Sequence, residues 1–478
     1  MKLQDVFDGD TVHEECGVFG IYDMGDGLDV SRLTYYALYA LQHRGQESCG
    51  IAVNNKDEND QIRILQYKDK GLVQEVFNDF VLKELTGYAA VGHVRLGTAD
   101  SASRDNAQPL VSRYQKGSFA IANNGTLVGA DKIRHELEQS GAIFQTSTDS
   151  EIFAHLLAKE RIGTNSTAEA LMKLMKEVSG SYCLVIMTPH RMVVARDPQG
   201  FHPLVVGKIK NSWVFASETC ALDSINAEYV RDVEPGEVIV VDDNGMQSYR
   251  DMCGQKSALC IFEYIYSARP DSIVDGQSVH RARLNAGKYL AQDSGVEADL
   301  VIGVPDSGLD AALGYSQESG IPYGIGFIKN RYIGRTFILP TQAEREAALR
   351  IKLNAMREEI NGKRVVMVDD SIVRGTTCKR IVNLLRSAGA TEVHVRISSP
   401  AFLNPCYFGT DIDSRDKLIA CQMSIEETRE LIGADTLAYL SIDALPKLAP
   451  NCKLNCCDAC FTGNYPIYVP QEDNSLNQ

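Results

Sequence analysis

The chain has 478 residues, 44% of them hydrophobic, and its 63 acidic against 48 basic side chains give a formal net charge of -15. A chain of this length usually forms more than one hydrophobic core, so we expect two domains. No stretch approaches the ~20 consecutive apolar residues of a membrane helix, and the acidic balance repels a phosphate backbone. We therefore expect a soluble protein with neither a membrane nor a nucleic acid as its partner.

The N-terminal segment Met1–Glu15 is acidic and lacks the basic and apolar regions of a secretory signal, which predicts a cytoplasmic protein. In that reducing compartment, the 13 cysteines are expected to be buried thiols, ligands or nucleophiles instead of disulfides. At the other end of the chain, the polar tail Gln471–Gln478 is expected to fray.

Short apolar runs alternate with amphipathic segments from Cys16 to about Val241. The runs that predict strands are Gly17–Tyr22, Gln61–Gln66, Tyr88–Val94 and Arg191–Val194. The segments that predict helices are Val30–Gln42, Asp149–Lys159 and Thr167–Val178, with Asp149 and Thr167 in N-cap positions. This half is expected to be a layered α+β domain.

Beyond a turn-prone joint at Met252–Ala258, apolar strands alternate with long helices. Asp299–Val304 and Arg364–Val368 are predicted strands, and each is followed by a short loop and a helix. This alternation predicts a parallel sheet covered on both faces, in which ligands bind at the carboxyl ends of the strands.

The predicted strand Arg364–Val368 ends in two adjacent carboxylates and a turn rich in small hydroxyl residues. The N–H groups and dipole at the start of the following helix would favour a phosphate there. A lone Asp-Asp pair is more simply a turn with an N-cap, but the full segment 364–377 closely resembles the phosphoribosylpyrophosphate fingerprint of the type I phosphoribosyltransferases. That resemblance implies an α/β fold and assigns the ribose, the 5-phosphate and magnesium to Asp369, Asp370, Ser371, Gly375, Thr376 and Thr377.

Two further segments fit the same family. Gly303–Gly308 resembles its loop that contacts pyrophosphate and magnesium, with Ser307 at the matching metal-ligand position, although this motif is weak alone. Lys329–Thr336 gathers cations around a glycine, including Lys329 and Arg331, and suits a mobile flap that closes over a polyphosphate. The simpler interpretation of this segment is a solvated basic loop.

Cys16 stands at the first position of an apolar strand, directly behind the acidic leader. Alone it would most simply be a small buried side chain. Together with other motifs in this order, it strongly resembles the class II glutamine amidotransferase domain of the N-terminal-nucleophile hydrolases, a four-layer αββα sandwich. Those motifs are His43–Ser48, Gly92–Thr98, Asn123–Gly125 and Ser147–Glu151.

In that family, removal of the leader leaves the cysteine with a free α-amine, whose reference pKa of about 8 lets it accept the thiol proton. The resemblance makes Cys16 the nucleophile and forms the oxyanion hole from Asn124 and the N–H of Gly125. The family often has a histidine where this chain has Asn123, and we assign that residue no role.

The charged groups of glutamine need partners of opposite charge. The resemblance pairs Arg95 with the α-carboxylate and Asp149 with the α-ammonium of the substrate. The simpler interpretation is an ordinary surface ion pair for Arg95 and a helix cap for Asp149.

Cys457 and Cys460 form a C-x-x-C pair near the C-terminus, a spacing that suits two thiolate ligands of one metal centre. A redox dithiol is the alternative, but no thioredoxin-like unit follows it. Cys260 and Cys406 supply further thiols from distant segments, and the sequence alone does not show that they meet.

The order of motifs over Cys16–Tyr465 resembles the glutamine phosphoribosylpyrophosphate amidotransferases, and the cysteine contexts resemble their iron–sulfur-containing branch. The resemblance implies a [4Fe–4S] cluster on Cys260, Cys406, Cys457 and Cys460. Four thiolates would also suit zinc. Cys457 is preferred to Cys456 because it keeps the two-residue gap before Cys460, and Cys452 and Cys456 receive no function.

The resemblance implies the reaction of glutamine, phosphoribosylpyrophosphate and water to 5-phosphoribosylamine, glutamate and diphosphate, the first step of de novo purine (IMP) biosynthesis. It also implies Mg²⁺, a homotetramer and inhibition by purine nucleotides. The alternatives are another class II amidotransferase, which the fingerprint at 369–377 disfavours, or a non-catalytic phosphoribosylpyrophosphate-sensing regulator. The expected bounds are 1–15 for the leader, 16–250 for the amidotransferase domain, 251–465 for the phosphoribosyltransferase domain and 466–478 for the tail.

Overall fold

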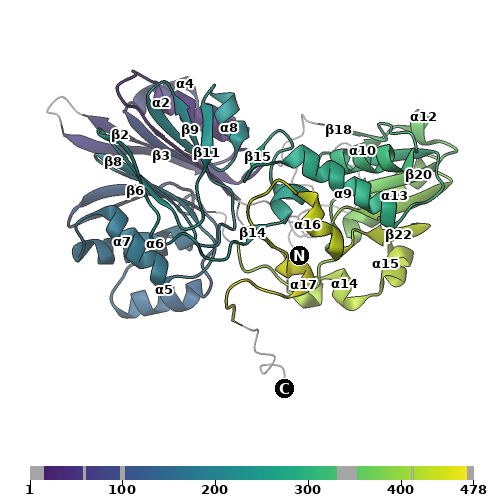
Figure 1. Cartoon of the computed structure of the whole chain (residues 1–478). Helices are drawn as coiled ribbons and strands as arrows, with labels where there is room; N and C mark the ends of the chain where they lie inside the picture. The colour runs from purple at the N-terminus through teal and green to yellow at the C-terminus, as the bar shows by residue number, and fades with distance from the viewer. Residues whose placement is uncertain are drawn as a thin grey trace.

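The computed structural model describes residues 16–56, 61–96, 103–330, 353–410, 412 and 414–470. The predicted leader, the flap from residue 331 onward and the tail from residue 471 lie outside these ranges. Figure 1 shows the described chain as two halves that meet along one boundary, and the yellow C-terminal segment lies along that boundary. Within the described residues, no helix is both long and apolar enough to cross a membrane.

Two antiparallel sheets pack face to face in the described part of the N-terminal half. The strand order of the first is β11 (Glu228–Asp232), β9 (Val205–Ile209), β10 (Ser212–Ala216), β1 (Gly17–Tyr22), β4 (Ala89–Arg95), β2 (Ser48–Lys56) and β3 (Ile62–Lys70). The strand order of the second is β13 (Gly245–Tyr249), β12 (Val238–Asp242), β8 (Arg191–Arg196), β7 (Cys183–Thr188), β6 (Gly117–Asn124) and β5 (Leu110–Tyr114). Apolar side chains from both sheets, among them Val18 and Val185, fill the space between them.

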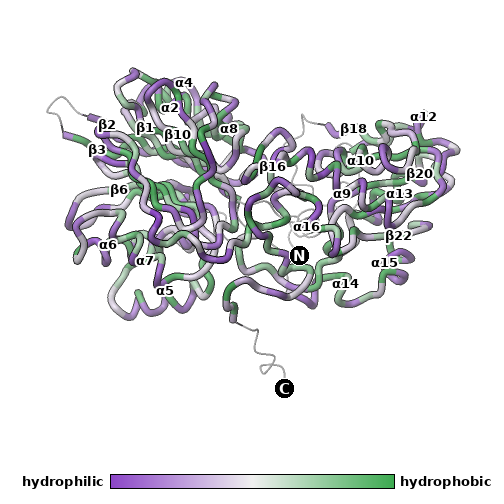
Figure 2. The backbone as a smooth tube through the Cα atoms, viewed as in Figure 1, coloured by the Kyte–Doolittle hydropathy of each residue, from purple (hydrophilic) through white to green (hydrophobic). Residues whose placement is uncertain are grey.

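Helices cover the outer face of each sheet. Those on the side of the first sheet are α2 (Val30–Ala40), α3 (Val73–Val76), α4 (Asp79–Glu84) and α8 (Thr219–Ser224). Those on the side of the second are α5 (Ala130–Gln139), α6 (Asp149–Ile162) and α7 (Thr167–Glu177). The layers run helix, sheet, sheet, helix, which confirms the expected αββα sandwich; in Figure 2 the interior strands of this half are largely green and the outer loops largely purple.

The strands and helices expected in this half form, but the two expected N-caps are wrong by one residue. Thr148 precedes α6, and Asp149 is its first helical residue. Ser166 precedes α7, and its hydroxyl accepts a hydrogen bond from the N–H of Glu169. A serine or threonine next to each expected cap competes for the same position, and composition alone does not decide between such neighbours.

A parallel sheet forms the core of the C-terminal half, as expected. Its strand order is β17 (Leu300–Gly303), β20 (Arg364–Asp369), β21 (Glu392–Ile397) and β22 (Thr436–Tyr439). Helices α9 (Val279–Asp293) and α10 (Gly308–Ser319) pack on one face, and α13 (Thr376–Ser387) and α15 (Ile425–Ile432) pack on the other. The strand run 365–368 is fully buried because both faces are covered.

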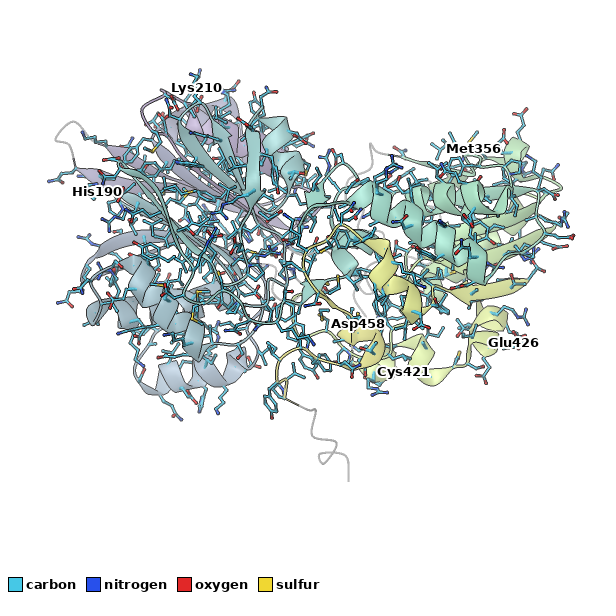
Figure 3. The ribbon with its side chains drawn as sticks, viewed as in Figure 1. His190, Lys210, Met356, Cys421, Glu426 and Asp458 are labelled. Atoms are coloured by element: carbon cyan, nitrogen blue, oxygen red, sulfur yellow. The ribbon has the colours of Figure 1, made fainter. Side chains whose placement is uncertain are left out.

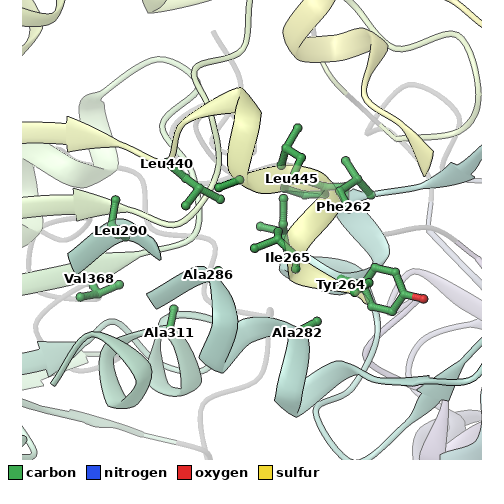
Figure 4. Close-up of a cluster of buried hydrophobic side chains, with 14 of the residues drawn as sticks. Phe262, Tyr264, Ile265, Ala282, Ala286, Leu290, Ala311, Val368, Leu440 and Leu445 are labelled. Atoms are coloured by element: carbon green, nitrogen blue, oxygen red, sulfur yellow. The ribbon is translucent and has the colours of Figure 1, made fainter. Parts of the chain in front are cut away.

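Shorter elements complete the C-terminal half and its boundary with the N-terminal half. The paired strands are β14 (Leu259–Cys260) with β23 (Cys456–Cys457), β15 (Ile273–Val274) with β16 (Gln277–Ser278), and β18 (Phe327–Lys329) with β19 (Leu353–Ala355). The short helices are α12 (Arg357–Ile360), α14 (Ile419–Gln422), α16 (Leu445–Leu448) and α17 (Ala459–Thr462), with 3₁₀ turns at Arg415–Lys417 and Ile442–Ala444. A π-helical turn, Glu263–Ser267, follows β14, and Figure 4 shows Tyr264 and Ile265 of this turn packed among Ala282 and Leu445.

Candidate active site

Cys16 and Arg95 lie at the same end of two neighbouring strands. β1 and β4 are antiparallel with Gly17 opposite Val94, so Cys16 lies beside the end of β4. The Cys16 thiol donates to the carbonyl of Leu96 at 3.8 Å. The pairing of two buried strands therefore brings together two of the residues expected at the glutamine site.

The Arg95 guanidinium is held by a carboxylate that the sequence interpretation did not assign. Nη1 of Arg95 donates to Oε2 of Glu47 at 2.7 Å, and each of the two side chains is only 10% exposed. A Cβ on Gly45 would lie 2.6 Å from the backbone of Arg95, so this loop presses against the strand. Arg95 is thus in an ion pair, but a buried and oriented one. Glu47 lies within the His43–Ser48 motif, which was the available signal.

The last residue of β6 carries a buried side-chain amide that has no hydrogen-bond partner within the described ranges. Asn124 is fully buried, and neither its amide nitrogen nor its amide oxygen has a partner among the described residues. Gly125 follows with φ +130°, and a Cβ there would lie 2.3 Å from the carbonyl oxygen of Ser181, so only glycine fits. Nδ2 of Asn123 donates to the carbonyl of Gly125 at 3.2 Å, which gives this unassigned residue a role in shaping the turn.

A histidine links this turn to the first sheet. Nε2 of His93, on β4, donates to the backbone carbonyl of Asn123, on β6, at 2.9 Å. Burial lowers the pKa of His93 to about 3, so the ring is neutral near pH 7 and Nε2 carries the proton. This contact fixes the separation of the two sheets where β4 and β6 end.

Asp149 lies beside the same turn. As the first residue of α6, it directs its carboxylate Oδ2 to accept the N–H of Leu127 at 2.8 Å. Burial raises the pKa of Asp149, although this hydrogen bond and Arg134 favour the charged form. The carboxylate therefore holds the segment that follows Gly125 and does not cap its own helix.

The loop with Ser307 and the paired aspartates meet at the carboxyl ends of adjacent strands. Gly303 of β17 is opposite Val368 of β20, and the N–H of Val304 donates to the carbonyl of Val368 at 2.9 Å. A Cβ on Gly308 would lie 2.5 Å from that same carbonyl. This close packing places the hydroxyl of Ser307 where it donates to Asp370.

Asp370 accepts hydrogen bonds from two serines. The Ser307 and Ser371 hydroxyls each donate to its carboxylate, and its own N–H donates to Oδ1 of Asp369 at 3.0 Å. Burial raises the pKa of Asp370, while the two serines and the buried Arg283 oppose that shift. The site concentrates carboxylate oxygens, the ligand type that Mg²⁺ prefers.

A glycine shapes the turn from Asp370 into α13, the predicted phosphate cradle. Gly375 is the N-cap with φ +80°, and a Cβ there would lie 2.8 Å from Cδ1 of Ile419. Thr376 and Thr377 form the first turn of α13, and the N–H groups in the first turn of a helix point toward an anion bound at that end. Nearby, Nζ of Lys329 pairs with Asp306 at 2.6 Å; Arg331 lies outside the described residues.

The predicted cysteine ligands converge although they come from distant segments. Cys260, Cys406, Cys457 and Cys460 line one cavity, together with apolar residues such as Phe262, Phe408 and Ile412. Cys260 and Cys457 are partners in the β14–β23 ladder. Asp458, labelled in Figure 3, marks this place at the boundary of the two halves. The neighbours Cys452 and Cys456 are not among the lining residues.

Burial keeps two of these cysteines protonated. All are free thiols. Burial, followed by neighbouring Cys406 and Asp458, raises the pKa of Cys457 to about 12, and burial with Cys406 and Cys457 raises that of Cys460 well above its usual range. Thiols so placed become thiolates when a cation is bound beside them. In the described part of the chain, no three histidine, cysteine or acidic side chains lie close enough to hold a single ion.

Comparisons with known proteins agree with both halves. A family profile described as a glutamine amidotransferase domain matches residues 93–224, and one described as a phosphoribosyl transferase domain matches residues 272–398. The amidophosphoribosyltransferase of Bacillus subtilis is 49% identical over 468 residues, covering 96% of both chains. That of Archaeoglobus fulgidus is 47% identical over 460 residues, covering 96% of this chain and 99% of its own.

Solved structures show the same relationship over the whole fold. One, described as the allosteric regulatory enzyme of purine biosynthesis, superposes with a TM-score of 0.88 at 48% identity and covers 96% of this chain and 97% of its own. Another, a glutamine phosphoribosylpyrophosphate amidotransferase from B. subtilis complexed with ADP and GMP, has a TM-score of 0.87 at 48% identity and covers 96% and 98%. The chain belongs to the amidophosphoribosyltransferase family.

Proposed function

We propose that this chain converts glutamine, phosphoribosylpyrophosphate and water into 5-phosphoribosylamine, glutamate and diphosphate, the opening step of purine biosynthesis. The N-terminal half releases nitrogen from glutamine, and the C-terminal half makes C1 of the sugar electrophilic. Support comes from the family membership over nearly the full chain and from two sites whose charges match those two substrates.

One observation carries the glutaminase half of this proposal. The amide of Asn124 is fully buried and has no hydrogen-bond partner among the described residues, which is costly unless a ligand completes it. Its neighbour Gly125 has a positive φ and no room for a side chain. An amide N–H and a backbone N–H side by side form an oxyanion hole, which is where a negative oxygen would satisfy the orphaned donor.

The hydrolysis of glutamine then follows from the placement of its groups. Arg95, oriented by Glu47, binds the α-carboxylate, and Asp149 binds the α-ammonium. After removal of the leader, the α-amine of Cys16 takes the thiol proton, and the thiolate attacks the side-chain amide carbon. Collapse of the tetrahedral intermediate breaks the C–N bond, and the amine returns the proton to the departing ammonia. Water then cleaves the thioester to glutamate.

Phosphoribosylpyrophosphate is bound by the cradle at the carboxyl ends of β17 and β20. Asp369 and Asp370 accept hydrogen bonds from the ribose hydroxyls and stabilise the positive charge that grows on C1. The 5-phosphate is bound by Ser371, Gly375, Thr376 and Thr377. Ser307, Asp369 and Asp370 would hold Mg²⁺, which supplies neutralisation of the departing diphosphate when bound. Ammonia attacks C1, the C1–O bond breaks, and diphosphate leaves with its electron pair.

Lys329 and Arg331 belong to the basic segment that we assign to closure over the diphosphate. In the free protein Lys329 pairs with the exposed carboxylate of Asp306, next to the metal-ligand serine. Exchange of that carboxylate for a polyphosphate would draw the segment over the bound substrate and exclude water from the path of ammonia.

A [4Fe–4S] cluster would be held by Cys260, Cys406, Cys457 and Cys460. Its role is structural, and its presence makes the protein sensitive to oxygen. The support is their convergence on one apolar cavity from three segments of the chain. Four thiolates that bind one group would connect residues 260 and 406 to the C-terminal segment with Cys457 and Cys460.

The remaining parts of the proposal concern organisation. The domain bounds are 1–15 for a removed leader, 16–250 for the amidotransferase, 251–465 for the phosphoribosyltransferase and 466–478 for the tail. The similar B. subtilis structure was solved with ADP and GMP, which supports inhibition of this chain by purine nucleotides. We further propose a homotetramer located in the cytoplasm.

The proposal is tested by anaerobic assay of purified protein with glutamine, Mg²⁺ and phosphoribosylpyrophosphate, with the N-terminus read by mass spectrometry. We expect glutamate and diphosphate in equal amounts and a mature N-terminus at Cys16. Cys16→Ala should lose the glutamine-dependent reaction and keep the one driven by added ammonia. Absence of diphosphate release with either nitrogen source would contradict the proposal and favour a sensing role.

A further inference from the structure

A loop of the C-terminal half reaches from the cysteine cavity to the wall of the glutamine site. This cysteine loop, residues 406–410, begins at Cys406, whose sulfur accepts the N–H of Phe408 at 3.4 Å. It ends at Thr410, whose hydroxyl oxygen lies 3.9 Å from the sulfur of Cys260. Residues at both ends of the loop therefore contact sulfur atoms of the cavity.

The middle of the cysteine loop docks on the N-terminal half. The carbonyl oxygen of Phe408 accepts the hydroxyl of Ser181 at 2.5 Å and Nε2 of His202 at 2.8 Å, and both donors are fully buried. The Phe408 ring stacks on that of Phe201, with centroids 4.2 Å apart. A carbonyl that accepts two buried donors has a fixed position.

Ser181 uses the same hydroxyl to hold residues 124–126, the turn that carries the proposed oxyanion hole and is called the oxyanion turn below. Its Oγ accepts the N–H of Thr126 at 2.9 Å, and its own N–H donates to the carbonyl of Thr126 at 3.0 Å. A Cβ on Gly125 would lie 2.8 Å from Oγ of Ser181. The hydroxyl thus connects the residue that follows Gly125 to Phe408, which is 227 positions away from Ser181 in the chain.

The two loops also approach each other directly. Gly409 has φ +119°, and a Cβ built on it would lie 3.0 Å from Nε2 of His202 and 3.8 Å from Cα of Gly125. A side chain at residue 409 would therefore contact the oxyanion turn, so the backbones of the two loops lie next to each other with no room for a side chain between them.

We propose that Ser181 is a positioning residue for glutamine hydrolysis, because its hydroxyl fixes the Asn124–Gly125 turn to the Phe408 carbonyl of the cysteine loop. This inference rests on the proposed function, since it takes that turn to be the oxyanion hole. Ser181 touches no reacting atom. Donation to Phe408 leaves an Oγ lone pair directed at the N–H of Thr126, and this sets the direction of the Gly125 N–H one residue earlier. Displacement of the cysteine loop then weakens glutamine hydrolysis before it affects transfer to the ribose.

The test compares Ser181→Ala with the unchanged full-length protein. Removal of a whole oxyanion donor costs about 10²–10³ in kcat, so misplacing one is expected to lower the glutaminase kcat about 10- to 100-fold. The KM for glutamine should stay within about twofold, because Arg95 and Asp149 bind the ground state. Synthesis from added ammonia should be unchanged. Hydrogen exchange at the Thr126 amide should accelerate, since that N–H loses its acceptor.

Two further variants separate positioning from general destabilisation. Ser181→Thr keeps the hydroxyl and should recover most of the glutaminase kcat. Ser212→Ala removes another fully buried serine hydroxyl, which bonds Asp23 and the N–H of Met24 far from the site, and should leave kcat unchanged.

The outcomes are distinguishable from failure of the proposed function. If Ser181→Ala loses glutamine-driven and ammonia-driven synthesis equally, or keeps the full glutaminase kcat, Ser181 does not position the oxyanion turn. Unchanged exchange at Thr126 would contradict the contact itself, whatever the activity. Absence of both reactions in the unchanged protein would instead refute the proposed function and leave the exchange result to test the contact.

Discussion

Nε2 of His93 donates to the backbone carbonyl of Asn123 at 2.9 Å, and this hydrogen bond crosses from one sheet of the N-terminal half to the other. It holds the strand that carries Arg95 against the strand that leads into the oxyanion turn. The ring is neutral because burial lowers its pKa to about 3. The geometry of the glutamine site therefore depends on an uncharged histidine.

This histidine makes stability fall in acid. Between its folded pKa of about 3 and the unfolded value of about 6.5, the unfolded chain binds a proton that the folded protein rejects. Its stabilising effect is complete above about pH 6.5 and decreases by about 2 kcal/mol at pH 5. His93→Gln replaces the ring N–H donor with an amide N–H donor and removes the titratable group. Urea denaturation at pH 7.5 and pH 5 should show a smaller acid loss for His93→Gln than for the unchanged protein; equal losses would contradict this prediction.

Asn124→Asp tests the oxyanion hole. A carboxylate in place of the buried amide removes a donor and repels the developing oxyanion, so the glutaminase kcat should fall at least about 10²–10³-fold. The ammonia-driven reaction should persist, because it uses the other site. The matched control is Asn55→Asp, whose amide bonds Thr86 at the surface and should change neither rate. Loss of both rates in Asn124→Asp would indicate unfolding instead.

Asp370→Asn tests the phosphoribosyl site. The Asp370 carboxylate accepts hydrogen bonds from the Ser307 and Ser371 hydroxyls. Removal of its charge should abolish synthesis from both glutamine and ammonia, while slow hydrolysis of glutamine alone continues. Asp299→Asn changes an exposed carboxylate before β17, at the opposite end of the same sheet, and serves as the control. The prediction is checked by measuring diphosphate release with each nitrogen source. Normal release from Asp370→Asn would exclude the assigned site.

Cys457→Ser and Cys456→Ser separate the cysteine ligands. Cys457 lines the cavity and its direct neighbour Cys456 does not, so Cys457→Ser should lower bound iron and sulfide and Cys456→Ser should not. Metal analysis and visible absorption of anaerobic preparations give the result. Zinc in place of iron would contradict the cluster, and equal losses in both variants would contradict the choice of Cys457.

Arg44→Met tests the ionic contact between the two halves. The fully buried guanidinium of Arg44 donates to Glu218 of the N-terminal half and to Glu263 of the π-helical turn. Although burial opposes it, Arg44 and His43 hold the pKa of Glu218 well below its usual range. Loss of Arg44 leaves buried carboxylates underpaired and should cost about 3–5 kcal/mol. Denaturation midpoints measure this. Arg32→Met, in an exposed ion pair, should change the midpoint little.

Elements that depend on local patterns were predictable from the sequence. Gly17–Tyr22 is a continuous apolar run, and Arg364–Val368 is apolar after its first residue. Each forms a largely buried strand with site residues at one end. The turn at Gly375 was predictable because a glycine followed by hydroxyl residues is a common start of a helix, and the helix begins at Thr376. Where equivalent residues are neighbours, as at Thr148 and Asp149, the local signal does not fix the position.

Contacts between distant residues were not predictable in this way. The motif His43–Ser48 places Glu47 in the glutamine site, but the local pattern does not indicate that it pairs with Arg95. Nor does it indicate that the Ser181 hydroxyl meets the Phe408 carbonyl, because groups of many segments compete for the same partners. The convergence of Cys260 and Cys406 with the C-x-x-C pair likewise depends on the packing of β14 against β23. The sequence indicates which chemistry is present, and the fold determines which groups meet.

The most direct test of the account is transfer of labelled nitrogen within one molecule. Glutamine labelled with ¹⁵N at its side-chain amide is supplied with phosphoribosylpyrophosphate and Mg²⁺ in a solution containing excess unlabelled ammonium near neutral pH. The product 5-phosphoribosylamine is trapped and analysed by mass spectrometry. The account predicts that it carries the ¹⁵N label in proportion to the glutamate formed. Product that carries the isotope ratio of the bulk ammonium, with glutamate released independently, would contradict it.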